Sequence, residues 1–521
     1  MTFIALAKPM GNAPESPTGR CSRATVTGFP CGGGMALLDR LPLLSLNDAG
    51  LGMPWGVRMP LSGHTSKGLL MKHLLFGTTA LVAASIVAGG ANAQAKPAEK
   101  IKLGVGGYFQ AYFVAGDEDD AAPSGVIPAQ PGYARRSHGI KREAEVIFSG
   151  KTTLDNGIDV GVNIQLEAES CADIIDESYI FVEGSFGRIE AGAINSAPYR
   201  MHYAPPNPSG SSAFGLNSPN IRVLQPGTNQ TLAVGLPSTY QNLTSDAEKI
   251  SYYTPRLAGF QLGISYTPDN CEEGAVGSST GNNCGGSYSG FQGDEEIGQQ
   301  TEVFEIGVNY VGKIMAVDVA ASLGYGKGNL ENNIRAAAFT AGGGTVIAAG
   351  ALAAGGQSFN PTGATLAADS LDDREEYGIG LNLSYMGFTI GGAYRYDNLG
   401  TDSGHPLDDH KVWSVAGRYV WGPWGIGVQY THAETSFRSG NILNNAGAVA
   451  YTNVGGEDEL DAFEVGLTYQ LGPGILLATG IQFWSLDASN GNVNRVANTA
   501  TDALVAENDA TIFYFGTSIS F

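Results

Sequence analysis

Acidic and basic side chains recur at alternate positions along several stretches of the chain, and these residues could act on a solute or an ion. A β-strand places every second side chain on the same face. On that basis the candidates share a face with small polar residues: Lys141, Glu143, Glu145, Glu167, Glu169, Arg188, Glu190, Arg395 and Arg418. Charges of both signs around a narrowing would orient dipolar solutes and filter ions by their field. The alternative is that each is an ordinary solvated side chain.

Runs of carboxylates form a second kind of candidate site. They include Asp117, Glu118, Asp119 and Asp120, and further along the chain Asp372 and Asp373. Calcium is a hard cation that binds several oxygen ligands, so such runs could share Ca²⁺ at an outer surface. The alternative is a solvated surface of self-repelling charge. No other cofactor is indicated.

Sequence motifs give little support to enzyme chemistry. Beyond residue 93 the sequence holds the five histidines His138, His202, His405, His410 and His432, without a His-Glu-x-x-His or phosphate-binding Gly-Lys motif. Cys271 and Cys284 flank a Gly/Ser/Asn-rich stretch and could pair in an oxidising compartment. Cys171 is left over, and no Cys-x-x-Cys pattern exists. The sequence therefore favours a protein that is not an enzyme, although a Ser–His pair formed in space would permit a hydrolase.

The N-terminal region carries a secretory signal. Residues 71–93 begin with Met71-Lys72, continue as an apolar run over 74–88, and end in Ala91-Asn92-Ala93, which is typical of a signal peptide and its cleavage site. Because a secretory signal works from the N-terminus, we expect residues 1–70 to be absent from the mature protein. The alternative is an N-terminal membrane anchor.

The mature chain is strongly acidic. Residues 1–93 hold 7 Lys+Arg and 3 Asp+Glu, so 29 − 7 = 22 basic and 50 − 3 = 47 acidic residues remain, a formal charge of −25. A nucleic-acid-binding surface needs the opposite sign, and the charge favours attraction of cations. The body of the chain has no apolar window of about 20 residues, so it offers no helical membrane span.

Alternation of apolar and polar residues is the main structural signal. In the last twelve residues, Phe513, Phe515, Thr517, Ile519 and Phe521 share one face. The same period predicts sixteen strands over residues 101–115, 138–154, 158–169, 174–184, 187–194, 249–253, 260–267, 301–311, 314–326, 374–385, 388–398, 410–421, 424–434, 460–471, 475–488 and 510–521.

The connections between these strands alternate in length. Tight turns, such as Asn156-Gly157, Gly312-Lys313 and Met386-Gly387, alternate with long polar loops over 116–137, 195–248, 268–300, 327–373, 399–409, 435–459 and 489–509. Short turns on one rim and long loops on the other are typical of a transmembrane antiparallel β-barrel, whose strands must close because lipid offers no hydrogen-bond partner. A soluble β-sandwich or several β domains would explain the alternation alone. Residues 94–521 are therefore predicted to form an all-β barrel domain.

Sixteen strands leave an aqueous lumen rather than a packed core. The predicted inward faces are small and polar, for example Gly378, Gly380, Asn382 and Ser384, or Glu464, Gly466 and Thr468. Aromatic residues stand at both ends of outward faces, as interfacial girdles require. Along the chain, Tyr266, Tyr310, Tyr385, Tyr430 and Tyr469 end such faces, and Phe388, Trp413 and Trp424 begin them.

Three segments carry a resemblance to a known family: Gly107-Tyr108-Phe109, residues 177–192 (ESYIFVEGSFGRIEAG) and the terminal Phe521. With the strand count and the long third loop, the chain over 101–521 resembles the trimeric general porins of Gram-negative bacteria, especially the alphaproteobacterial type. Phe521 resembles the signal that the barrel-assembly machinery recognises.

The resemblance implies an outer-membrane homotrimer, in contact with lipid and lipopolysaccharide, that passes small hydrophilic solutes by diffusion. It also implies short periplasmic turns, long extracellular loops and a third loop, 195–248, folded inward as a constriction. This loop departs from the acidic run common in the family, because 195–245 holds Arg200, His202 and Arg222 but no Asp or Glu. The alternatives are a substrate-selective channel of the same fold, a non-conducting adhesin or structural barrel, and an outer-membrane hydrolase.

Overall fold

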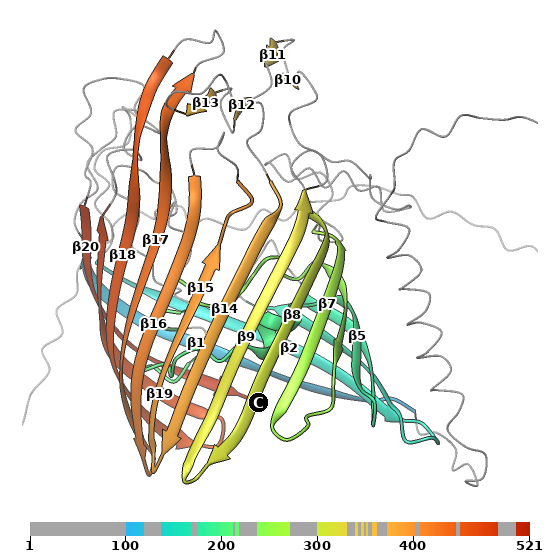
Figure 1. Ribbon diagram of the computed structural model, residues 1–521. Coiled ribbons are helices and arrows are strands. Elements are labelled where there is room, and N and C mark those ends of the chain that lie inside the picture. Colours follow the sequence, from blue (N-terminus) through green and yellow to red (C-terminus); the bar gives the residue numbers. More distant parts are fainter. Residues whose placement is uncertain are drawn as a thin grey trace, which may run out of the picture. The chain divides into compact units, whose positions relative to one another are not determined.

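The alternating segments form antiparallel strands that hydrogen-bond into one sheet in the computed structural model (Figure 1). The structure describes residues 100–118, 137–168, 175–211, 214–217, 237–270, 300–330, 339–341, 345–347, 351–352, 357–361, 372–401, 407–443, 449–487 and 507–521. The predicted signal peptide, residues 1–70 and the three cysteines beyond residue 93 lie outside these ranges.

Eighteen strands belong to the sheet, and without the short β12 and β13 sixteen of the described strands form a barrel. They are β1 (Lys102–Glu118), β2 (His138–Thr153), β3 (Asp159–Glu167), β4 (Ile175–Gly184), β5 (Gly187–Ala193), β6 (Glu248–Tyr253), β7 (Phe260–Asp269), β8 (Gln300–Ile314), β9 (Val317–Leu330), β14 (Arg374–Tyr385), β15 (Phe388–Asp397), β16 (Leu407–Trp421), β17 (Trp424–Leu443), β18 (Val449–Gly472), β19 (Ile475–Asp487) and β20 (Glu507–Ser520).

The barrel closes between its first and last strands. Each strand pairs with the next, β9 pairs with β14, and β1 pairs with β20 from Tyr108↔Ser520 to Glu118↔Ala510. Phe521 extends this seam, because its N–H and C=O each bond Gly107 of β1 at 3.1 Å. No strand of the barrel therefore keeps an open edge, which confirms the predicted sixteen-stranded closed barrel.

The outward face is apolar and carries two aromatic bands. Near the short turns lie the ring pairs Phe260–Tyr310, Phe388–Tyr419 and Trp424–Tyr469, and nearer the other rim lie Tyr377–Tyr396 and Trp413–Tyr430. On β14, the step from Tyr377 to Tyr385 spans ~27 Å at ~3.4 Å per residue. With a strand tilt of about 40°, the separation of the two rings along the barrel axis is roughly 20 Å, close to the height of the apolar band of such barrels.

Helical structure is minimal in the described residues. The five-residue α2 (Ala197–Met201) follows β5, with Pro198 in its first turn, where a missing N–H costs nothing. No helix in the described ranges is long and apolar enough to cross a membrane.

One predicted turn lies elsewhere. The sequence placed the β8–β9 turn at Gly312-Lys313, but both residues are paired in the ladder and the chain turns at Met315 and Ala316. This register sets Lys313 opposite Asp318, with their charged atoms 3.2 Å apart, and Gly307 opposite Gly324. The glycine was therefore a misleading turn signal.

Strands also replace much of one predicted loop. Residues 435–459 were expected to be a polar loop, but β17 continues to Leu443 and β18 begins at Val449. The ladder extends from Phe437↔Gly456 to Leu443↔Val449, because backbone pairing does not require apolar side chains. This hairpin reaches beyond its neighbours at the upper rim of Figure 1. In the loop 327–373, β10 (Phe339–Ala341) pairs with β11 (Thr345–Ile347), and β12 (Ala351–Leu352) pairs with β13 (Gln357–Pro361), which also pairs with β17.

Deleting Phe521 should lower the yield of folded barrel, because the deletion removes both backbone hydrogen bonds to Gly107 and an outward aromatic side chain. The measurement is the amount of heat-modifiable protein in isolated outer membranes, with Ser520→Ala as the control. A normal yield from the deletion variant would show that the seam closes without this residue.

Candidate functional site

The segment between β5 and β6 runs inside the barrel and crosses the inner wall. We call its described residues, 195–211, 214–217 and 237–247, the inward loop. Its backbone meets side chains of successive strands: Ala197 N–H donates to Ser265 Oγ (2.8 Å), Tyr203 N–H donates to Ser322 Oγ (2.9 Å), and Asn382 Nδ2 donates to Ala204 O (2.8 Å). The wall thus satisfies polar groups that the loop buries.

Glycines on the wall make room for α2 and for the Gln241 side chain of the inward loop, which lies against Gly378. Gly263, Gly307, Gly324 and Gly378 face one another across the ladders of β7, β8, β9 and β14. A Cβ added at Gly307 would lie 3.0 Å from Pro198 Cα, and one at Gly324 would lie 2.7 Å from Pro198 Cβ. Only a residue without a side chain allows the helix to lie this close to the sheet.

A second glycine row supports the next part of the inward loop. Gly427 of β17 faces Gly466 of β18, and added Cβ atoms would lie 3.0 Å from Pro208 Cα and 2.7 Å from Pro208 O, respectively. On β14, a Cβ at Gly380 would collide with Tyr203 O. The small inward faces are therefore covered here by the loop, whereas the sequence indicated water. Neighbouring inward side chains are buried as well, namely Gln429, Thr431, Glu464 and Thr468.

Lys249 ties the two stems of the inward loop together. Lys249 is 4% exposed, and its Nζ donates to Ser245 O (2.8 Å), Ala247 O (2.6 Å) and Ile194 O. Ile194 precedes the loop and the other two residues end it. The three donors of one ammonium thus close the base of the loop.

Glu464 of β18 holds the middle of the loop. Its carboxylate accepts hydrogen bonds from Tyr514 Oη (2.7 Å), Gln482 Nε2 (3.1 Å) and the backbone N–H groups of Ser209 and Leu216. A buried carboxylate is tolerated only with such a full set of donors. Phe214 stacks on Tyr112 with ring centroids 4.0 Å apart and meets Tyr514 edge-on at 4.9 Å.

Arg395 of β15 binds the returning limb. Its Nη1 donates to Ser238 O (3.2 Å) and Tyr240 O (3.1 Å), while its Nε lies 2.8 Å from the Glu376 carboxylate. Asp397 lies beside it and accepts from Arg374 at 2.5 Å and 3.0 Å. The predicted pore arginine Arg395 therefore acts as an anchor of the loop.

Glu190 of β5 anchors the first turn of the loop. Its side chain is fully buried and bonds Arg188 Nε at 2.6 Å and Arg200 of α2. Arg188 also reaches Glu183 at 2.9 Å, and its guanidinium lies 3.8 Å above the Phe181 ring. Both arginines are thus held in ion pairs with glutamates.

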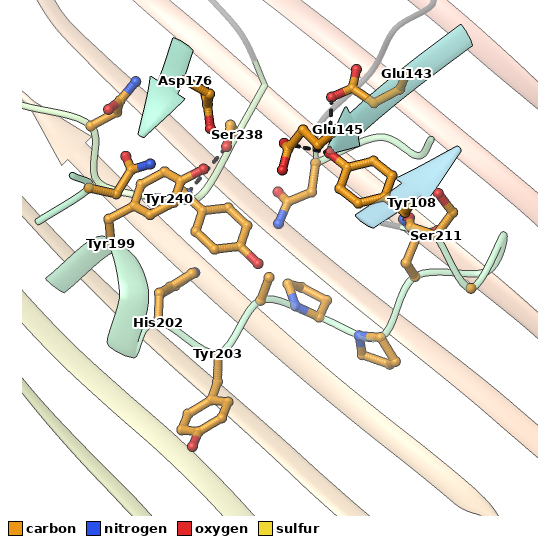
Figure 2. A pocket seen from close by; sticks show the side chains of 18 of the residues that line it. Tyr108, Glu143, Glu145, Asp176, Tyr199, His202, Tyr203, Ser211, Ser238 and Tyr240 are labelled. Atoms are coloured by element: carbon orange, nitrogen blue, oxygen red, sulfur yellow. Dashed lines mark hydrogen bonds between the residues drawn. The ribbon is translucent and has the colours of Figure 1, made fainter. Parts of the chain in front are cut away.

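A cavity of about 710 Å³ remains between the inward loop and the opposite wall. From the wall come Tyr108 of β1, Glu143 and Glu145 of β2, and Glu167 of β3, with Asp176 of β4 beside them. Figure 2 shows the Tyr108 hydroxyl pointing at both β2 carboxylates, across from the rings of the loop. The other lining residues include Tyr199, His202, Tyr203, Ala204, Pro205, Pro206, Asn207, Ser238, Tyr240, Asp246 and Arg418.

Burial favours the neutral forms of three rings of the inward loop, His202, Tyr199 and Tyr240. Burial lowers the pKa of His202 to about 4, since the desolvated imidazole resists protonation. Burial also raises the pKa of Tyr199 to about 12 and raises that of Tyr240. His202 Nε2 lies 3.1 Å from the Thr239 hydroxyl, a neutral partner.

The predicted site residues fall into three groups. Four of them line the cavity together: Glu143, Glu145, Glu167 and Arg418. Their position suits contact with a solute, and their role in the pore stays a prediction. Arg188, Glu190, Arg200 and Arg395 bind one another or the loop. Lys141 is exposed on β2, and Glu169 and Arg222 lie outside the described residues.

Residues that sequence reasoning missed are Tyr108, Lys249, Glu464 and the rings of the inward loop. The alternation places the three wall residues on inward faces, which was a usable signal. Nothing in the sequence indicated what would lie against them, because their partners are distant loop carbonyls, amides and carboxylates.

The expected Ca²⁺ site stays a prediction. Asp119 and Asp120 lie outside the described residues, while Asp117 and Glu118 end β1. Asp373 lies 3.2 Å from Lys327 Nζ, and Asp372 Oδ1 accepts from Asp373 N–H at 2.8 Å. Within the described ranges, three or more His, Cys, Asp or Glu side chains nowhere gather as a metal-holding group.

Lys249→Met should loosen the inward loop, because three buried carbonyls lose their donor at about 1–3 kcal/mol for each unsatisfied group. We expect at least tenfold faster chymotrypsin cleavage after Tyr199, Tyr203 or Tyr240 in the folded barrel, since 1.4 kcal/mol is tenfold in population. Mass spectrometry of the fragments measures it. Lys313→Met, at the exposed pair with Asp318, is the control, and equal rates in the two variants would contradict the anchoring role.

Comparison with known proteins agrees with this architecture. A family model described as Gram-negative porin matches residues 77–489. An uncharacterized protein of Rickettsia bellii is 31% identical over 110 residues. The match covers 19% of this chain and 25% of the Rickettsia protein, so the chain spans about a quarter of the length of that relative.

Similar solved structures include the anion-selective porin from Comamonas acidovorans, with 13% identity, a TM-score of 0.44, and coverage of 81% of this chain and 100% of that chain. Outer-membrane expressed OmpT of Vibrio cholerae has 12% identity, a TM-score of 0.45, and coverage of 82% and 100%. The family model spans well over half of the 521 residues. The chain therefore belongs to the Gram-negative porin family.

Proposed function

We propose that this outer-membrane porin lets small hydrophilic solutes and ions diffuse passively through its barrel. The observation that carries the proposal is the cavity of about 710 Å³ left open between the inward loop and the wall of β1–β3. Its lining is polar on the wall side, so it suits water and hydrated solutes.

The proposed mechanism is steric sieving at a fixed aperture. Anchors at Lys249, Glu464, Arg395 and Glu190 hold the inward loop at its base, middle, returning limb and first turn. A loop held at so many points keeps the width of the opening constant. No bond is made or broken in transport, and the gradient of the solute supplies the driving force.

Non-enzymatic action is part of the same proposal. Ser322 Oγ and His202 Nδ1 form a Ser–His contact inside the barrel, but they are 3.5 Å apart. The other ring nitrogen of His202 meets Thr239 instead of a carboxylate, and burial lowers the imidazole pKa to about 4. Such a histidine is a poor general base at neutral pH, so this pair does not favour a hydrolase.

We also propose a homotrimer, as in the trimer form solved for OmpT of Vibrio cholerae. The face of β3–β5 supports it, because its described outward residues lack Phe, Tyr and Trp, unlike the aromatic bands elsewhere. They include Val160, Val162, Ile164, Ile180, Val182, Ile189, Ala191 and Ala193. Short aliphatic side chains allow another copy to pack closely. The remaining outward face would contact lipid and lipopolysaccharide, and the barrel-assembly machinery would insert the chain.

Purified protein in a planar bilayer should show large conductance steps that arrive in threes, because each trimer inserts three water-filled pores at once. The measurement is single-channel current in potassium chloride. A heat-modifiable barrel that stays silent would contradict the channel, and single steps would contradict the trimer.

Deleting residues 205–240 should raise the single-channel conductance, because the deleted residues include several that line the cavity, among them Pro206, Asn207 and Tyr240. The control is deletion of 440–453 from the β17–β18 hairpin, which lies beyond the neighbouring strands. Equal conductance in wild type and the 205–240 deletion would show that the loop does not limit the current.

A further inference from the structure

Arg418 of β16 is the single lysine or arginine among the described residues that line the cavity. It lies on the inward face of β16, and its Nη2 donates to Thr468 Oγ1 of β18 at 2.9 Å. Its Nε is buried and forms no hydrogen bond with any described residue. Within the part of the chain that the structure describes, a neutral hydroxyl is thus the hydrogen-bond partner of this guanidinium.

The other described arginines on inward faces of the wall each bind a carboxylate. The pairs include Arg188–Glu190 at 2.6 Å, Arg374–Asp397 at 2.5 Å and Arg395–Glu376 at 2.8 Å. A charge that is partly removed from water loses solvation free energy, and a paired carboxylate compensates for that loss. Among the described residues Arg418 has no such carboxylate partner, so its charge is available to a counter-ion that enters the cavity.

Two glycines make room for the Arg418 guanidinium. A Cβ added at Gly210 of the inward loop would lie 3.1 Å from Arg418 Nη2. A Cβ added at Gly425 of β17 would lie 2.9 Å from the same atom and 2.6 Å from Thr468 Oγ1. Gly210 also has a φ of 67°, which disfavours any side chain at that position. The guanidinium is therefore held in one position between the wall and the inward loop.

The β2 carboxylates of the cavity stand on another side of the barrel. Glu143 and Glu145 lie on β2, and the strands between β2 and β16 are β1, β20, β19, β18 and β17. Six steps of ~4.8 Å correspond to roughly 29 Å along the wall. Because the Debye length is about 8 Å in physiological salt, these two carboxylates do little to neutralise Arg418 or to repel an anion held beside it.

We infer that Arg418 is a binding site for the carboxylate or phosphate group of small solutes that pass through the cavity. A guanidinium is planar and can donate two parallel hydrogen bonds to two oxygens of such a group, whereas chloride offers a single atom. The bound group supplies the counter-charge that the described wall lacks at this position. The inference rests on the proposed channel function and names a class of solute that the channel holds during passage.

The first test is the single-channel conductance of wild type, Arg418→Gln and Arg418→Lys over a series of potassium acetate concentrations. Binding inside a channel makes the conductance saturate, and the concentration at half-saturation measures the affinity. We expect this concentration to rise about fivefold or more in Arg418→Gln, because one unit charge at ~4 Å in water contributes that factor. Arg418→Lys keeps the charge but not the planar fork, so it should show a smaller rise.

The matched control is Arg256→Gln. Arg256 lies in the exposed turn between β6 and β7, where it donates to Gly259 O and Gln261 Oε1, and it is not among the described residues that line the cavity. The half-saturating concentration of this variant should stay at the wild-type value.

An equal half-saturating concentration in wild type and Arg418→Gln, or an equally large rise in Arg256→Gln, would overturn the inference. Conductance of these proteins in potassium chloride would leave the channel proposal intact in that case, whereas a silent wild type would contradict the channel itself. If Arg418→Gln fails to fold, Thr468→Val replaces it, because it keeps the guanidinium but removes the hydroxyl that orients it. Its expected result is a smaller rise, and no rise would count against the inference.

The second test distinguishes the two kinds of oxyanion group and repeats the concentration series in potassium phosphate and in potassium chloride. A rise caused by Arg418→Gln in acetate alone would assign the site to carboxylates, a rise in phosphate alone would assign it to phosphates, and a rise in both would support their shared chemistry. An equally large rise in potassium chloride would show that Arg418 acts through its charge alone, and would overturn the assignment to an oxyanion group.

Discussion

The close approach of the inward loop to the barrel wall is the constraint on which the rest of the structure depends. Glycines that face one another on β7, β8, β9 and β14 leave room for α2 and Gln241, and a second pair on β17 and β18 leaves room for Pro208. A loop pressed against a sheet loses water from its own N–H and C=O groups. The wall replaces that water with side chains such as Ser265, Ser322 and Asn382.

This constraint divides the wall into two parts whose charged side chains have different roles. Behind the loop, charged side chains hold the loop in place: Lys249, Glu464 and Arg395 each form hydrogen bonds with its backbone. A buried charge needs such partners, since desolvation alone would cost several kcal/mol. The part across the cavity, with Tyr108 and the carboxylates of β2, lines the cavity. The same residue types thus attach the loop on one side and line the cavity on the other.

Alternation in the sequence predicted the strands, the closing pair and the inward position of Arg395 and Arg418, because each depends on local periodicity. The roles of these arginines depend on what lies against them, which periodicity does not contain. Arg395 binds Tyr240 O, whereas Arg418 reaches the cavity. The prediction was wrong at the β8–β9 turn, which lies at Met315, and at the loop that β17 replaces. In both places ladder pairing outweighed the local signals of glycine and polarity.

The long hairpin of β17 and β18 has a consequence for how this surface can change over generations. Its ladder continues from Phe437↔Gly456 to Leu443↔Val449, and none of these residues lines the cavity. Substitutions in this part of the ladder therefore leave the lining of the cavity unchanged, and the sequences of the hairpin and of the cavity can vary independently of each other.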